Sequence, residues 1–163
     1  MPDHVPKPLS AAELRARQRR VQRLARQFGI EGRVEYRHVR SRSGGAQYFS
    51  GPTAESDLLT VYTEAFERDA DPEDFSLEAI LAHERGHQLL VRHPRLARLV
   101  PKPMSLTTEE ILSSLLGSLL VEHPKDKQDM MMKALAEAAQ TGRDLNQLRA
   151  EFEELRTMME KIL

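Results

Sequence analysis

The residues Leu81-Ala82-His83-Glu84-Arg85-Gly86-His87-Gln88-Leu89-Leu90 are the most informative stretch of this sequence. His83 and His87 are four residues apart, so on an α-helix they lie about 40° apart in projection and both imidazoles can reach one ion. Glu84 stands beside that ion, where its carboxylate can take a proton from metal-bound water. Apolar residues flank the motif and predict a buried helix: Leu77, Ile80, Leu81, Leu89, Leu90 and Val91. Because buried polar side chains need partners, a metal ion is a natural partner for the paired histidines.

The whole chain is 163 residues long, which suits one domain with a core of its own. It contains no cysteine, so disulfides are excluded and any metal must be held by histidines and carboxylates. No run approaches the roughly 20 apolar residues that cross a bilayer, and the N-terminal residues lack an apolar signal core. We therefore expect a cytoplasmic protein with no membrane partner.

The charge is unevenly distributed, although the net charge is only -1. Residues 1–42 carry eleven Arg and Lys against four Asp and Glu, which gives +7 and leaves -8 for the rest of the chain. A positive block of this kind can meet nucleic acid or an acidic partner, or it can dock on the acidic half of its own chain. The small net charge and the few aromatic residues favour docking on the same chain, so we do not expect a nucleic-acid partner.

The pattern of the first 75 residues predicts an N-terminal helix followed by a small three-stranded sheet. Residues 1–9 hold three prolines and should form an irregular tail. Ser10 and Glu13 form a capping box that begins a helix ending at Gly29. Strands are expected at Arg33–Arg40, Ala46–Ser50 and Leu58–Thr63, with Ser43-Gly44-Gly45 as the turn between the first two. The acidic stretch that follows, which contains Asp69, Asp71, Glu73 and Asp74, is interpreted as a solvated loop.

Two helices should carry the metal-binding residues. Ser76 is the expected N-cap of the motif helix, which should run to about Arg92 or His93 because Pro94 disfavours helix in the residue before it. Thr107 or Thr108 should begin the second helix, which we expect from Glu109 to about Val121. Its small residues should allow close approach to the motif helix: Ser113, Ser114, Gly117 and Ser118.

Residues 124–163 should form a C-terminal helical hairpin. Pro124 suits the first turn of one helix, which should end near Thr141-Gly142, and Asp144 and Gln147 should cap the other. Apolar residues recur every three or four positions along the last helix: Leu145, Leu148, Phe152, Leu155, Met159 and Ile162. We expect a monomer in which this helix packs on its own chain, with a weak homodimer through it as the alternative.

A catalytic zinc site needs a third protein ligand, and Glu110 and His93 are the candidates. Glu110 lies in the first turn of the second helix, although with Thr107 it also fits a capping box. His93 comes six residues after His87. If the motif helix continues to His93, that side chain is rotated about 240° from His87 and lies about 9 Å further along the axis, so it points away. This favours Glu110 and keeps His93 as the alternative.

The motif stretch resembles the HExxH helix of the gluzincin zinc peptidases, and Glu110-Ile111-Leu112-Ser113-Ser114 resembles their glutamate-bearing helix. The small sheet and the short chain are similar to the ImmA/IrrE-like peptidases and to the minimal soluble gluzincins (minigluzincins). The resemblance covers roughly residues 30–122. It implies a single zincin-like metallopeptidase domain of the α+β class over residues 1–163, with Zn²⁺ held by His83, His87 and Glu110. Ser114 stands where gluzincins usually carry an Asp or Asn that supports a histidine ligand.

The resemblance also implies a zinc metalloendopeptidase that acts on a peptide or protein substrate. Zinc would polarise the scissile carbonyl and lower the pKa of its water toward ~7, while Glu84 would act as general base and then give a proton to the leaving amine. An extended substrate would add along the strand Leu58–Thr63 as a sheet edge. Tyr62 and His123 are the candidates for stabilising the oxyanion. The alternative function is a zinc-stabilised regulatory or protein-binding module with little or no peptidase turnover.

Overall fold

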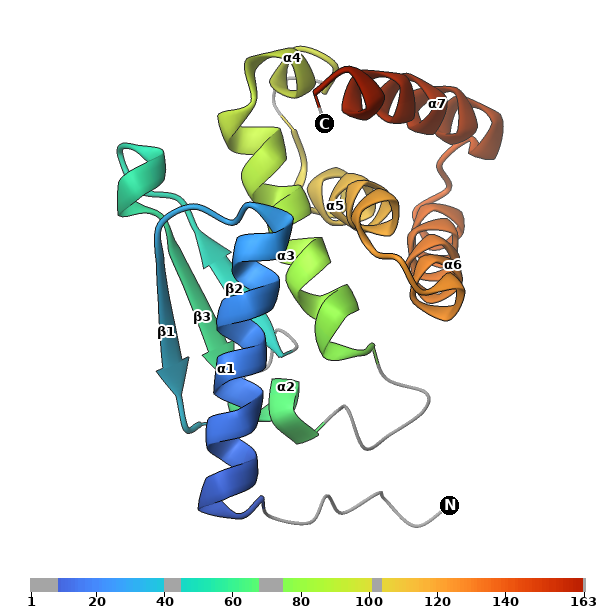
Figure 1. Ribbon diagram of the computed structural model, residues 1–163. Helices are drawn as coiled ribbons and strands as arrows, with labels where there is room; N and C mark the ends of the chain where they lie inside the picture. Colours follow the sequence, from blue (N-terminus) through green and yellow to red (C-terminus); the bar gives the residue numbers. More distant parts are fainter. Residues whose placement is uncertain (1–8, 40–44, 68–74, 101–103, 163) are drawn as a thin grey trace, which may run out of the picture. The chain divides into compact units, whose positions relative to one another are not determined.

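The computed structural model describes residues 9–39, 45–67, 75–100 and 104–162. Within these ranges the chain is α+β and mostly helical, with seven α-helices and a three-stranded mixed sheet (Figure 1). It divides into two compact units, residues 1–81 and 82–163, with the division inside the motif helix. The expected tail at 1–9, apart from its last residue, and the acidic loop lie outside the described residues. The expected single domain over 1–163 stays a prediction.

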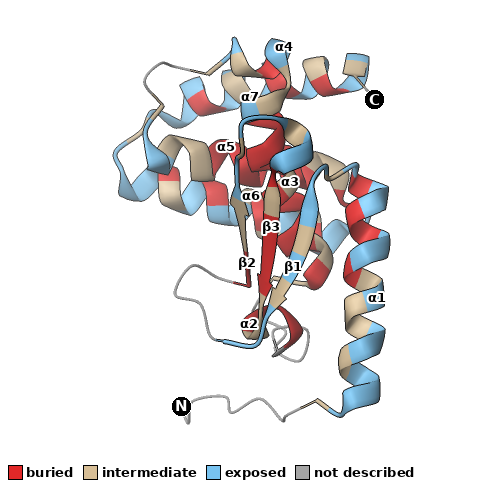
Figure 2. Ribbon diagram, turned by 90° about the vertical axis from the view of Figure 1, so that its left-hand side faces the viewer, coloured by how far each residue is buried: buried red, intermediate tan, exposed pale blue. Residues whose placement is uncertain are grey.

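The first unit begins with helix α1, Ala11–Phe28, which follows the predicted boundaries. The Ser10 hydroxyl accepts from the backbone N–H of Glu13, and the Glu13 carboxylate accepts from the backbone N–H of Ser10, so the capping box is present. Gly29 adopts a φ of 72°, a left-handed conformation that glycine enters at little cost, and this ends the helix. The inner face of α1 is buried through Val21, Leu24, Ala25 and Phe28, while the outer face is exposed (Figure 2).

The sheet consists of β1 (Arg33–Arg37), β2 (Ala46–Phe49) and β3 (Leu58–Tyr62) in the order β1-β3-β2. Strand β1 pairs with β3 in parallel, and β2 pairs with β3 in antiparallel orientation. The expected hairpin between the first two strands is therefore wrong, because β3 lies between them. The expectation that Leu58–Thr63 is a sheet edge is wrong for the same reason. Leu59, Thr60 and Val61 are buried in succession, which is the pattern of a strand covered on both faces (Figure 2).

Asp57 fixes this strand order. Its backbone carbonyl accepts from Arg33 N at 2.9 Å, which brings the start of β1 beside the start of β3. Its carboxylate accepts from the Tyr48 hydroxyl at 2.7 Å and from Gly51 N at 2.9 Å, which holds β2 on the other side. The bond between Asp57 and Arg33 joins residues from two different strands far apart in sequence, so local turn signals do not predict it. After β3 the chain forms the short helix α2, Thr63–Glu67, which was not predicted.

Helix α3, Leu77–Arg92, carries the motif. The Ser76 hydroxyl accepts from Ala79 N at 3.1 Å, so the predicted cap is confirmed. The helix ends before His93, which takes an extended conformation and caps the short helix α4, Pro94–Ala97.

The second unit contains three further helices: α5 (Leu106–Leu120), α6 (Pro124–Gln140) and α7 (Leu145–Ile162). The N-cap of α5 is Ser105, whose hydroxyl accepts from Thr108 N at 3.1 Å. The expected caps Thr107 and Thr108 are therefore wrong, because the serine offers an equivalent hydroxyl two or three residues earlier.

Helix α7 packs on its own chain, as the repeat of its apolar residues predicted. Leu148, Leu155 and Met159 are buried in one core cluster with α5 and α6, while Leu145 remains exposed. The Asp144 carboxylate accepts from Asn146 N and Gln147 N and caps the helix. None of the described helices combines the length and the apolar character needed to span a membrane.

Candidate metal centre

Two glycines bring helices α3 and α5 close together within the second unit. A Cβ atom on Gly86 would lie 2.4 Å from the backbone carbonyl oxygen of Ser113, so only glycine fits at this point of α3. A Cβ atom on Gly117 of α5 would lie 2.9 Å from the backbone of Ala82. The predicted role of the small residues of α5 is borne out at Ser113 and Gly117. The consequence is that the histidine face of α3 lies directly against the first turns of α5.

The predicted ligands converge at this contact. The Nε2 atoms of His83 and His87 are 3.1 Å apart. The Nε2 atom of His83 lies 3.0 Å from Oε2 of Glu110, and that of His87 lies 3.0 Å from Oε1 of the same carboxylate. His83 and His87 are each 8% exposed, whereas the Glu110 side chain is 37% exposed, so the group opens toward solvent on the side of α5.

This spacing fits a metal ion of the size of zinc. Ligands at 2.0–2.1 Å in tetrahedral geometry lie about 3.3–3.4 Å from one another, which is within about 0.4 Å of the separation of the two Nε2 atoms and of the separation of each Nε2 atom from its own oxygen of Glu110. Two neutral imidazole nitrogens and a carboxylate oxygen are also a ligand set that zinc accepts, and it leaves a fourth position open. The donor atoms therefore fit the ion that the sequence predicted.

Glu84 lies beside the two histidines on the same helix. One oxygen of its carboxylate, with one nitrogen of His83 and one of His87, forms a group in which all three atoms lie within 4.8 Å of one another. Glu84 is 8% exposed and therefore buried. This arrangement suits a proton acceptor, the role predicted for Glu84.

The outer nitrogen of each histidine also has a partner on α5. His83 Nδ1 lies 3.0 Å from the Ser114 hydroxyl, so serine supports this imidazole at the position where gluzincins usually carry an acid or amide. His87 Nδ1 lies 3.0 Å from Oε1 of Glu109. In the sequence Glu109 is only the expected first residue of the second helix, and its contact with His87 was not predicted. The available signal was that Glu109 adjoins Glu110, so the two carboxylates approach a histidine pair together.

The charges of the site keep its groups in different protonation states. Burial lowers the pKa of His83, and the nearby Lys133 ammonium acts in the same direction. Burial also opposes the charged form of His87, but contacts with Glu109 and Glu110 outweigh it and raise the pKa of His87 to about 10. For Glu110, burial is outweighed by the two histidines, which hold its pKa well below the usual range. Without metal, a proton on His87 therefore binds where an ion would bind.

Among the described residues of the second unit, His93 and His123 are not part of the group that could hold a metal ion. His93 caps α4, and its Nδ1 atom is buried without a hydrogen-bond partner among the described residues. His123 caps α6 and accepts from Lys125 N at 3.2 Å. The Tyr62 hydroxyl, in the first unit, donates to Gln47 at 3.3 Å. The role of oxyanion stabiliser stays unassigned for both Tyr62 and His123.

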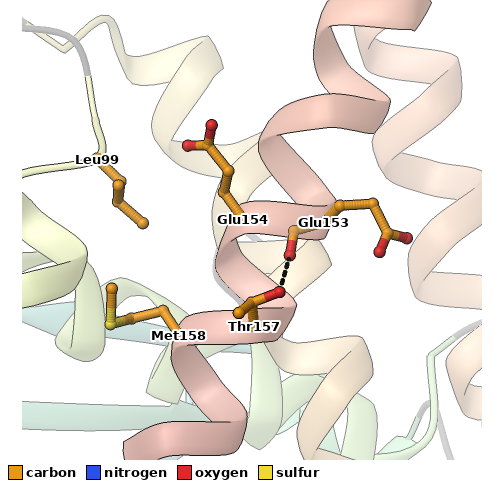
Figure 3. A pocket seen from close by; sticks show the side chains of 5 residues that line it. All are labelled: Leu99, Glu153, Glu154, Thr157 and Met158. Carbon is orange, nitrogen blue, oxygen red and sulfur yellow. Dashed lines mark hydrogen bonds between the residues drawn. The ribbon is translucent and has the colours of Figure 1, made fainter.

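A surface pocket of about 510 Å³ lies elsewhere in the second unit, between α7 and the turn after α4 (Figure 3). Leu99 and Met158 supply its apolar wall, and Glu153, Glu154 and Thr157 complete the lining. The Thr157 hydroxyl donates to the Glu153 carbonyl at 2.9 Å, so it is engaged within α7. None of the metal-binding candidates lines this pocket.

Comparison of the chain with protein-family models, with curated proteins and with solved structures found no match. The functional argument therefore rests on the site itself.

Proposed function

We propose that this protein is a zinc-dependent metallopeptidase with a zincin-like fold of the gluzincin type. The observation that carries the proposal is the convergence of His83, His87 and Glu110 at the junction of two closely packed helices. The two Nε2 atoms lie 3.1 Å apart, and each lies 3.0 Å from a different oxygen of the Glu110 carboxylate. Structural ion pairs also bring histidines and carboxylates together, but they do not need two imidazole Nε2 atoms directed at each other. A shared cation accounts for that arrangement.

Each residue has a distinct task in the proposed reaction. His83, His87 and Glu110 hold the ion, which when bound supplies Lewis-acid activation of a water molecule and of the scissile carbonyl. Glu84 accepts the proton of the attacking water and delivers it to the leaving amine, because it is a buried carboxylate beside the two histidines. Ser114 orients the ring of His83 and Glu109 orients the ring of His87, each through the Nδ1 atom.

The substrate class is an extended peptide or an unfolded segment of protein. Because β3 is central in the sheet, a substrate that adds a strand would have to pair with β1 or β2. The proposal does not depend on which of these two edges is used.

Two measurements on the same preparations test the proposal. Elemental analysis of metal-replete, unchelated protein should find one zinc per chain. Glu84→Gln, which keeps the size of the side chain, should retain the zinc and lose all cleavage of a broad peptide library and of unfolded proteins. Protein without zinc, nickel or cobalt would contradict the metal site. Wild-type protein that binds zinc but cleaves nothing would favour the regulatory module, and full activity in Glu84→Gln would remove Glu84 from the mechanism.

A further inference from the structure

We propose that Glu109 is a positioning residue for the metal site, which acts through His87 and makes it the firmly oriented imidazole ligand of the pair. This inference rests on the metal site of the proposed function. It goes beyond that function by assigning a task to a carboxylate that neither binds the ion nor moves the substrate's proton.

The contact geometry carries the assignment. Glu109 Oε1 lies 3.0 Å from Nδ1 of His87, the ring nitrogen opposite the one that lies beside His83 and Glu110. A carboxylate can only accept at this position, so Nδ1 must carry the hydrogen and Nε2 must present its lone pair to an ion. The Glu109 side chain is 26% exposed, so the contact is partly shielded from water.

His83 lacks an acceptor that fixes its tautomer in this way. Its Nδ1 atom meets the Ser114 hydroxyl, which can donate as well as accept and therefore does not fix the tautomer. An anionic acceptor also forms a stronger hydrogen bond than a neutral hydroxyl and makes the imidazole a better donor to the metal. The two ligands are thus supported unequally, and His87 has the charged partner.

Glu109 has one competing role, which the experiment must separate. It lies in the first turn of α5, where any acidic side chain stabilises the helix through its dipole. That role depends on charge near the helix end and not on contact with His87. Thr107 is exposed in the same turn, and a residue two positions away lies about 200° around the helix, so an acid there keeps the helix-end charge without reaching His87.

The test compares zinc affinity, measured by competition with a chromogenic chelator, in wild type, Glu109→Ala, Glu109→Gln and the double variant Thr107→Glu/Glu109→Ala. Loss of an outer partner of a ligand histidine typically weakens metal binding about 10–100-fold, which we expect for Glu109→Ala. Glu109→Gln keeps an acceptor oxygen and should lose less. The double variant should bind zinc as weakly as Glu109→Ala. A spectroscopic readout accompanies affinity: the downfield Nδ1–H proton signal of His87 in the zinc-loaded protein should disappear in Glu109→Ala.

Each outcome decides the proposal. Wild-type affinity in Glu109→Ala, or recovery of affinity in the double variant, overturns it and leaves the proposed function standing. Absence of zinc binding in wild type overturns both. If Glu109→Ala does not fold, Glu109→Gln with a native circular dichroism spectrum decides: weaker zinc binding supports the positioning role, and unchanged binding with an unchanged His87 signal refutes it.

Discussion

Gly86→Ala tests whether close packing of α3 on α5 creates the metal site. The added Cβ would lie 2.4 Å from the Ser113 carbonyl oxygen and 2.9 Å from its Cα, whereas ordinary contact begins near 3.4 Å. The clash involves backbone atoms, so a side-chain rotation cannot relieve it. The helices would have to separate by about 3.4 − 2.4 = 1.0 Å at this point.

A separation of this size should affect metal binding more than folding. Overpacking costs about 1–3 kcal/mol, and alanine in place of a helical glycine returns about 0.5–1 kcal/mol, so the net loss of stability should be about 0–2.5 kcal/mol. The Glu110 oxygens, however, would move about 1 Å from the histidines, while metal–ligand distances tolerate about 0.2 Å. Zinc affinity should therefore fall at least tenfold in a protein that remains folded.

The assay is a zinc titration against a competing chelator, with thermal unfolding of the metal-free protein measured alongside. Gly117→Ala is the matched comparison on the facing helix. Its Cβ would meet the Ala82 backbone at 2.9 Å, and its other contact is the end of the flexible Met130 side chain, so the required separation is only about 0.5 Å. We expect a smaller loss of affinity in Gly117→Ala than in Gly86→Ala. Wild-type zinc affinity in Gly86→Ala would refute the argument.

Three further predictions concern the charges and ligands of the same site. Glu110→Ala should weaken zinc binding by orders of magnitude and His93→Ala should leave it nearly unchanged in the same chelator competition; the reverse result would make His93 the third ligand. Lys133→Met should strengthen zinc binding about twofold to fivefold at low salt, and less at high salt, where charges are screened. The reason is that the Lys133 ammonium contributes to lowering the pKa of His83, and a positive charge at that distance also repels a dication. Zinc binding at pH 7–8 should release about one proton, because the raised pKa of His87, about 10, keeps it protonated until a metal requires the neutral ring. Affinity should then rise about tenfold per pH unit in this range, and calorimetry in buffers of different ionisation enthalpy measures the proton directly; a pH-independent affinity would contradict the protonated state of His87.

The sequence predicts those parts of the fold that depend on neighbouring residues. Three features were predicted from the spacing of neighbouring residues, and the structure contains them: the capping box of Ser10 and Glu13, the N-cap at Ser76 and the end of α3 before His93. The convergence of Glu110 on the histidines was also accessible, because the small residues of α5 predicted close packing.

The strand order could not be predicted from the sequence, because it depends on hydrogen bonds between residues of different strands. The Asp57 carbonyl binds Arg33 and its carboxylate binds Tyr48 and Gly51, and no pattern within one strand encodes these contacts. The glycines after the first strand suggested a tight turn between β1 and β2, but β3 lies between these two strands in the sheet. Because the position of β3 in the sheet was predicted wrongly, the strand expected at the edge of the sheet is the central one, and β1 and β2 are the edge strands.

The metal site depends on α5 more than on the motif that identifies it. The motif supplies two imidazoles and the proposed proton acceptor. Helix α5 supplies Glu110 as the proposed third ligand, Ser114 and Glu109 as the partners of the two outer nitrogens, and the Ser113 backbone against which Gly86 packs. Rotation of α5 by one residue would change all of these contacts together, since residues on one helix move as a rigid body. Helix α5 is in turn held in a core cluster that includes Leu148, Leu155 and Met159 of α7. If the proposed site binds a metal ion, we therefore expect core substitutions in α7 to weaken metal binding without any contact with the ion, because α7 packs in the same core cluster as α5.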